Sequence, residues 1–305
     1  MSANMNPDAL NSLPLVENEM PLSRAVSKEY FLSPNFTPKY MNRIIQEGIL
    51  LIAGAAAILL QIAEPGVGAG VNEHSNFAYR VLDRLRTTMT FVYAITYGTP
   101  EEKKTMVGMI TQVHSRVSGT LNEGQDKGKP YSALDPALQL WVAATLYATA
   151  ISLYERIWGM ITDEQEHDNI YFEYSILACS LQVPVDMWPP SRQAFWDYFN
   201  HKIATLEVTQ HARDVCEEIM YLRHAPLYLR IFMPGVRVCT SAFLPERIRW
   251  EYGLSSHPKM YKLLEWLIKG LYRPLPIKVR GYPATFYMRD MRRRLASRQK
   301  IFEKA

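Results

Sequence analysis

A helix-start signal recurs along this chain, in which a capping residue is followed directly by proline. The side chain of a Thr or Asp cap accepts a hydrogen bond from the first helical turn, and proline has the backbone angle that the first helical position needs. The signal occurs at Thr37-Pro38, Thr99-Pro100 and Asp135-Pro136, and Glu102 completes a capping box with Thr99. Because few runs show the period of two that half-buried strands require, the sequence predicts an all-α fold.

Segments of helical length and period alternate with clusters of glycine and proline. We predict helices over 38–62, 76–97, 100–118, 136–158, 163–181, 191–221, 245–252, 257–271 and 284–302. Gly66, Gly68 and Gly70 are expected at the end of a helix, and 119–134 as a long polar loop. The predicted organisation is a flexible N-terminal segment (1–36), a single multi-helix globular domain around an apolar pocket (37–283) and a basic amphipathic helix (284–305).

The composition excludes several classes of protein. The chain has 305 residues, of which 48% are apolar, so it can bury a core without disulfides or structural metals. Cys179, Cys216 and Cys239 lie far apart in no CxxC spacing, which excludes a zinc module and predicts a reducing compartment. Residues 1–30 lack the apolar run of a signal peptide, and the apolar run 49–60 is shorter than the roughly 20 residues that span a bilayer. We therefore expect an intracellular protein, cytoplasmic or peripherally membrane-associated, without a transmembrane helix.

The net charge of +4 is unevenly placed, because 289–305 contains seven Lys or Arg and two Asp or Glu and so carries +5. The remaining chain then carries −1, which argues against a nucleic-acid partner, since such proteins carry basic charge on the folded body. Apolar residues share one helical stripe of this basic segment: Met288, Met291, Leu295 and Phe302. The stripe fits packing against the protein, and it also fits peripheral contact of 289–305 with an anionic membrane surface or a partner.

Common enzyme templates are missing from the sequence: GxGxxG after a strand, GxxxxGK[ST], HExxH and GxSxG. The acidic run 163–168 (DEQEHD) could be taken for a metal site. Acidic residues also favour the first turn of a helix, and Thr162 is placed to cap one here. We interpret this run as a solvated helix start.

Two features carry possible chemistry. Arg84 and Thr88 lie four residues apart on one helical face, where a guanidinium beside a hydroxyl can hold an anionic group or a bound oxygen species. A surface arginine next to a threonine bonded to its own helix explains the same spacing. His114 has apolar helical neighbours, so its imidazole is expected on a buried face. It can then be a neutral iron ligand or a hydrogen-bonded core histidine.

Several segments together resemble one family, that of the fungal mycophenolic-acid-pathway oxygenase and the bacterial latex-clearing rubber oxygenase. The segments cover about residues 40–200. They are LLIAGAAAILLQIAEPGVGAGVNEHSNF (50–77), RLRTTMTFVYAITYGTPEE (84–102), HSRVSG (114–119), YSALDPALQLWVAATL (131–146), SLYERIWGMITDEQE (152–166) and LQVPVDMWPPS (181–191). The resemblance implies an all-helical fold that binds haem b in its apolar pocket.

The resemblance also implies roles for individual residues. His114 becomes the proximal haem ligand, while Arg84 and Thr88 become catalytic residues lining the haem pocket. Thr87 lies at the cofactor, where rubber oxygenases carry a lysine that approaches the iron. Two positions depart from the family pattern, because Glu64 and Ala143 stand where relatives often carry histidine.

The function implied is a haem-dependent oxygenase of specialised metabolism. It would use dioxygen to oxidise or cleave a C=C bond of a hydrophobic isoprenoid or polyketide-like substrate. The missing histidines leave open a cofactor-free cyclase or isomerase that has lost haem, since an apolar pocket can fold a flexible substrate into a reactive conformer. A third possibility is a non-enzymatic protein that binds an apolar ligand.

Overall fold

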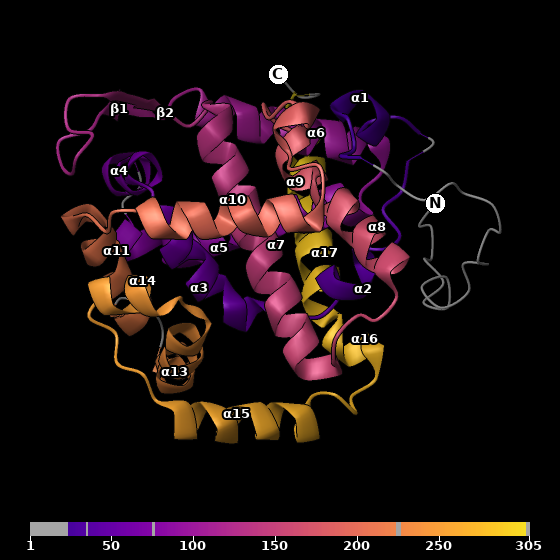
Figure 1. Cartoon of the computed structure of the whole chain (residues 1–305). Coiled ribbons are helices and arrows are strands. Elements are labelled where there is room, and N and C mark those ends of the chain that lie inside the picture. The colour runs from indigo at the N-terminus through magenta and orange to yellow at the C-terminus, as the bar shows by residue number, and fades with distance from the viewer. Residues whose placement is uncertain (1–23, 35, 75–76, 224–226, 303–305) are drawn as a thin grey trace.

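The computed structural model describes residues 24–34, 36–74, 77–223 and 227–302. They form mostly helices around one main core, which confirms the all-α prediction (Figure 1). Strands β1 (Ser118–Thr120) and β2 (Pro130–Ser132) pair antiparallel in a small hairpin. Most of the predicted flexible segment 1–36 lies outside the described residues, and the division of the chain at 36 and 283 stays a prediction.

The helices follow one another in this order: α1 (Lys28–Phe31), α2 (Asn42–Ile45), α3 (Leu50–Ile62), α4 (Pro65–His74), α5 (Phe77–Tyr97), α6 (Pro100–His114), α7 (Pro136–Trp158), α8 (Glu164–Tyr174), α9 (Ile176–Cys179), the 3₁₀ turn η2 (Val185–Met187), α10 (Arg192–Thr205), α11 (Gln210–Tyr221), α12 (Leu227–Arg230), α13 (Met233–Phe243), α14 (Glu246–Glu251), α15 (Pro258–Leu271), α16 (Ile277–Arg280) and α17 (Tyr282–Phe302).

Helix α7 forms the centre of the core and packs along α3 (Figure 1). The Trp141 indole N–H donates to the Leu60 carbonyl at 3.0 Å, which joins the two helices. Within the described chain, α7 is the single continuous helix long and apolar enough to cross a membrane, and α3 with α4 passes the same test as a pair bent by 106°. Because 72% of the apolar stretch of α7 is buried inside the protein, we describe α7 as a core helix.

Two of the predicted helix starts are confirmed. The Thr99 hydroxyl accepts from the Glu102 N–H at 3.2 Å, and the Glu102 carboxylate accepts from the Thr99 N–H at 3.0 Å, which completes the capping box of α6. The Asp135 carboxylate accepts from the Ala137 N–H at 2.8 Å and begins α7 at Pro136. Both caps are local interactions, which explains why the sequence alone identifies them.

The predicted start at Thr37-Pro38 is wrong, because residues 36–39 form no helix and α2 begins at Asn42. The buried Glu173 carboxylate accepts the N–H groups of Lys39 at 2.8 Å and Met41 at 2.7 Å. These bonds hold the backbone before α2 in a non-helical path. The helix at the acidic run begins one residue later than predicted, because Asp163 rather than Thr162 caps α8.

Glu173 makes stability depend on pH. Burial raises the pKa of Glu173 to about 7 from 4.5, although the backbone N–H bonds oppose this shift. The folded state therefore keeps a proton that the unfolded state releases. The stabilisation from the proton on Glu173 is complete below pH 4.5 and is lost as pH rises through about 7. Over this pH interval, we expect the free energy of unfolding of the wild type to fall by about 3 kcal/mol. The Glu173→Gln variant should not show this fall, because glutamine does not titrate.

Urea unfolding near pH 5 and near pH 8 measures this difference. Glu29→Gln, at an exposed position of α1, is the matched control and should keep the wild-type pH dependence. Equal pH dependence in wild type and Glu173→Gln would show that Glu173 does not hold the proton.

Several predicted segments are divided in the structure, one of them by a contact with a distant residue. The segment 38–62 breaks at Gly48, whose N–H donates to the Arg280 carbonyl at 2.9 Å. A Cβ at Gly48 would lie 2.6 Å from that oxygen, so only glycine fits there. Segment 163–181 is divided into α8 and α9, and 191–221 into α10 and α11.

The helix predicted to end before Gly66, Gly68 and Gly70 does end at Ile62, but the glycines themselves lie inside the next helix rather than at a helix end. Helix α4 runs from Pro65 to His74 through Gly66, Gly68 and Gly70. A Cβ at Gly68 would lie 2.6 Å from the Ile62 carbonyl oxygen, so the glycine allows α4 to turn back closely on α3. The predicted loop 119–134 contains the hairpin β1–β2, where the Glu207 carboxylate accepts from the Gln125 N–H at 2.8 Å.

Helix α17 packs along α5 and is part of the main core. Met288 and Met291 are buried and Leu295 packs against the core, so these residues of the predicted apolar stripe face the protein. The side chain of Phe302, the fourth residue of the stripe, lies outside the described part. Arg86 donates to Asp290 at 2.9 Å, and Arg292 donates to Glu102 at 2.7 Å. Part of the basic charge of this helix is therefore paired with the body of the protein.

Candidate functional site

Helices α5 and α6 form a helical hairpin that brings Arg84 and His114 together. A turn of two residues, Gly98 and Thr99, joins the helices. Arg84 lies thirteen residues before the end of α5, and His114 lies fourteen residues after the first residue of α6. Because both helices rise equally per residue, these positions are opposite each other in an antiparallel pair. The positive charge of Arg84 lowers the pKa of His114, as expected for side chains on facing helices.

The environment of His114 keeps its imidazole neutral. Burial lowers the pKa of His114, and the positive charge of Arg84 lowers it further. Burial also lowers the pKa of the partly buried Arg84 guanidinium, which has a far higher ordinary value and stays charged. A neutral imidazole nitrogen is the form that coordinates a metal.

Two glutamines connect His114 to α7 and to the segment after α9. The Gln139 amide nitrogen lies 3.5 Å from His114 Nδ1 and donates to the Ala133 carbonyl at 2.7 Å and to Gln182 Oε1 at 2.6 Å. Gln182 returns a backbone N–H to Gln139 Oε1 at 3.0 Å, and its side chain donates to the Thr111 hydroxyl at 3.1 Å. This network fixes the wall of the site beside the imidazole.

The amide hydrogens of Gln139 are used by acceptors other than His114. An amide nitrogen has two hydrogens, and Ala133 and Gln182 accept both of those on Gln139. The 3.5 Å contact with His114 Nδ1 is therefore weaker than the two shorter bonds of Gln139. Within the described part of the chain, Nε2 of His114 has no hydrogen-bonding partner.

Thr87 and Thr88 are both exposed on α5. The Thr87 hydroxyl donates to the Asp83 carbonyl one turn earlier at 2.9 Å. Thr88 lies one turn after Arg84 on the same helical face. The roles of Thr87 and Thr88 at a cofactor stay predictions.

The two positions that depart from the family pattern lie on different elements. Glu64, between α3 and α4, accepts from the Lys202 ammonium of α10 at 2.6 Å. Ala143 is buried on α7, one turn after Gln139 and on the same face. The Ala143 position is thus adjacent to the residue that contacts His114.

Neither glutamine was identified from the sequence. Gln139 is a buried polar residue within the apolar segment of α7, and that contrast is a usable signal. Gln182 follows α9, so its place beside Gln139 depends on how the chain returns after α8 and α9.

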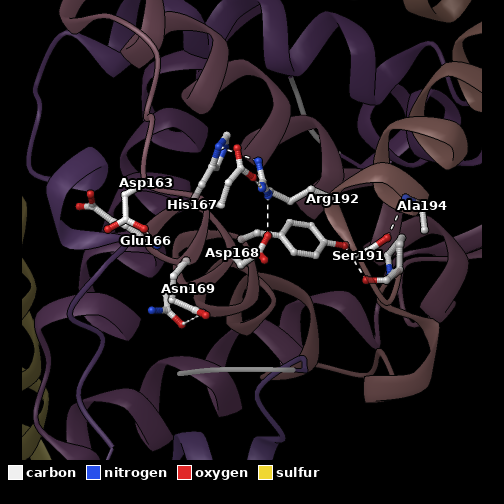
Figure 2. Close-up of polar contacts among 12 residues, drawn as sticks. Asp163, Glu166, His167, Asp168, Asn169, Ser191, Arg192 and Ala194 are labelled. Atoms are coloured by element: carbon white, nitrogen blue, oxygen red, sulfur yellow. Dashed lines mark hydrogen bonds and ion pairs between the residues drawn. The ribbon is translucent and has the colours of Figure 1, made fainter. Parts of the chain in front are cut away.

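The acidic run at the start of α8 forms a second polar cluster (Figure 2). The Arg192 guanidinium donates to Asp168 at 2.6 Å and to His167 Nδ1 at 2.8 Å, and it also pairs with Glu164. Burial, followed by the charge of Arg192, lowers the pKa of His167. Because an arginine already occupies the centre of the cluster, we assign it to the attachment of α10 to α8.

The donor set around His114 fits haem. Haem iron takes a protein side chain as ligand, and the partly buried His114, whose Nε2 has no partner among the described residues, could supply it. The Arg84 guanidinium matches the carboxylate of a haem propionate. A bare metal ion fits less well, because the described residues contain no group of three His, Cys, Asp or Glu that could hold one.

Comparison with known proteins gives two results. Residues 41–271 match the family described as ER-bound oxygenase mpaB/B'/Rubber oxygenase, catalytic domain. Uncharacterised proteins of Mycobacterium bovis and Mycobacterium tuberculosis are each 30% identical over 259 residues, which cover 82% of this chain and 100% of the relative. No solved structure matches the chain significantly. The matched range contains both Arg84 and His114.

Proposed function

Because the chain belongs to the ER-bound oxygenase mpaB and rubber oxygenase catalytic-domain family, we propose that it is a haem b-dependent oxygenase. Its substrate would be a hydrophobic isoprenoid or polyketide-like molecule of specialised metabolism, in which dioxygen oxidises or cleaves a C=C bond. The observation that carries the proposal is the partly buried His114 opposite the partly buried Arg84 in the α5–α6 hairpin.

Each residue of the site has a separate task in this proposal. Haem, when bound, supplies the dioxygen chemistry that amino-acid side chains lack. His114 would hold the iron through Nε2, while the Gln139 and Gln182 network holds the adjacent wall in place. Arg84 would orient a propionate or an oxygen atom that gains negative charge, and the Thr88 hydroxyl is available one turn away. Thr87 would lie at the cofactor, because its position corresponds to the lysine of rubber oxygenases.

The location we propose is intracellular, in the cytoplasm or at the surface of a membrane. Cys179, Cys216 and Cys239 are all free and buried, as in proteins of reducing compartments. Burial raises the pKa of the Cys179 thiol to about 12, so this thiol has little reactivity.

The first test is the visible absorption spectrum of protein expressed with ample haem. We expect an intense Soret band and oxygen uptake when an apolar polyene is added. Bovine serum albumin mixed with the same haem controls for non-specific binding. A folded protein that stays colourless with excess haem would reject the proposal.

A second candidate function is a cofactor-free cyclase or isomerase. It is favoured by the departures at Glu64, which is paired with Lys202, and at the buried Ala143. This candidate predicts turnover by colourless protein without oxygen, so strict oxygen dependence would exclude it. Binding of an apolar ligand without turnover would indicate a carrier instead.

A further inference from the structure

Helix α15 lies along one edge of the molecule (Figure 1). Several of its apolar side chains are exposed to solvent. Met260 and Leu263 are each 50% exposed, and Trp266 and Leu271 are each 69% exposed. Met260, Leu263, Leu267 and Leu271 recur at spacings of three and four residues, so they form one stripe. No residue of α15 is buried. Exposed apolar surface of this extent marks an interaction site.

The opposite face of α15 attaches the helix to the protein. Ile268 packs against the small cluster that contains Ile49 and Leu153. Tyr261 contacts the Phe243 ring at 6.1 Å between centroids, and its hydroxyl accepts from Arg156 at 3.0 Å. The helix is therefore held by its inner face, and internal packing does not account for the outer stripe.

Apolar exposure continues in the chain that follows α15. This stretch includes α16 and the first turns of α17, and its exposed apolar residues are Leu275, Val279, Tyr282 and Phe286. Helix α16 lies beside one end of α15 (Figure 1). The buried Glu47 carboxylate pairs with Arg280 and accepts from the Tyr272 hydroxyl at 3.0 Å, which anchors this stretch to the start of α3.

The charge on the same stretch is mostly positive. Helix α15 carries Lys259, Lys262 and Lys269 against Glu265, which pairs with Lys269 at 2.6 Å. Arg273 follows directly and is exposed. Lysine side chains beside an apolar stripe can extend to lipid headgroups while the stripe and a tryptophan enter the interface. A second copy of the same face would bring these like charges together.

We propose that the outer face of α15 binds the protein to the surface of an anionic lipid bilayer. The helix would lie parallel to the bilayer, with Leu263, Trp266 and Leu267 in the interfacial layer. This surface differs from the one that the basic segment 289–305 led us to expect, where Arg292 pairs with Glu102 and Arg294 pairs with Asp290. The proposal does not depend on haem or on catalysis.

Cosedimentation with vesicles tests the proposal. We expect binding to vesicles of equal parts phosphatidylcholine and phosphatidylserine, weaker binding to phosphatidylcholine alone, and a decrease with added sodium chloride. Leu263→Gln combined with Trp266→Gln should weaken partitioning by at least about tenfold, because both side chains leave the apolar layer. Lys259→Gln with Lys262→Gln should reduce the preference for phosphatidylserine.

The matched control is Tyr30→Gln with Val113→Gln. These residues are 50% and 55% exposed, and α1 and α6 lie at the opposite end of the molecule from α15 (Figure 1). The control should bind vesicles as wild type does, and circular dichroism should show equal helix content in all variants. Wild type that does not bind the mixed vesicles, or a Leu263/Trp266 variant that binds them unchanged, would overturn the proposal. Light scattering could instead show that the wild type is a dimer and the Leu263/Trp266 variant a monomer. That result would identify a second copy of the chain, and not a bilayer, as the partner of α15.

Discussion

Replacing His114 with alanine is expected to abolish the Soret band of the haem-loaded protein while the chain stays folded. The imidazole would hold the iron in the proposed site, so its loss should weaken haem affinity by more than about 100-fold. The cost in stability is expected to be only about 1 kcal/mol, because His114 is partly exposed at the last residue of α6. Haem titration followed by absorbance measures the first effect, and urea unfolding measures the second.

His201→Ala is the matched control, because His201 is exposed on α10. This variant should keep the wild-type spectrum. A His114→Gly variant adds a direct readout of ligation, because free imidazole can enter the space left by the side chain and restore the histidine-ligated spectrum. Full haem occupancy in His114→Ala would remove His114 from the site.

Phe195→Ala is expected to cause the largest loss of stability. Phe195 is fully buried on α10, and its ring centroid lies 4.8 Å from that of Tyr147 and 5.7 Å from that of Tyr171. Removing the ring leaves a cavity among side chains that other contacts hold in place. We expect the free energy of unfolding to decrease by about 3–5 kcal/mol.

The same substitution at Phe232, which is 69% exposed, provides the control and should change stability by less than about 0.5 kcal/mol. Urea unfolding monitored by circular dichroism distinguishes the two variants. A loss below about 1 kcal/mol for Phe195→Ala would mean that the surrounding rings close the cavity.

The sequence predicts the parts of the fold that local interactions determine. The starts of α6 and α7 depend on caps within three residues, and both were predicted correctly. The start at Thr37 failed because Glu173, more than 130 residues away, binds the backbone there. The helix predicted over 38–62 breaks at Gly48 because the carbonyl of Arg280 lies against it. Neither contact leaves a signal in neighbouring residues.

The candidate site divides in the same way. The proximity of Arg84 and His114 follows from two helices joined by a two-residue turn, so their lengths determine which residues are opposite. The contact of Gln139 with Gln182 requires the path of the chain through α8 and α9. The exposed stripe of α15 is periodic in the sequence, but periodicity alone does not show which face is covered.

The position of α17 determines when the protein can mature during synthesis. The α5–α6 hairpin has left the ribosome long before α17, because Arg86 and Asp290 are 204 residues apart. Until α17 is made, the face of α5 that packs against α17 stays uncovered, the core lacks Met288 and Met291, and Glu102 lacks Arg292. Domains fold as units, so we expect the hairpin that carries Arg84 and His114 to become fully rigid only when α17 docks. Stable formation of this part of the site should therefore follow the synthesis of α17 rather than that of α6.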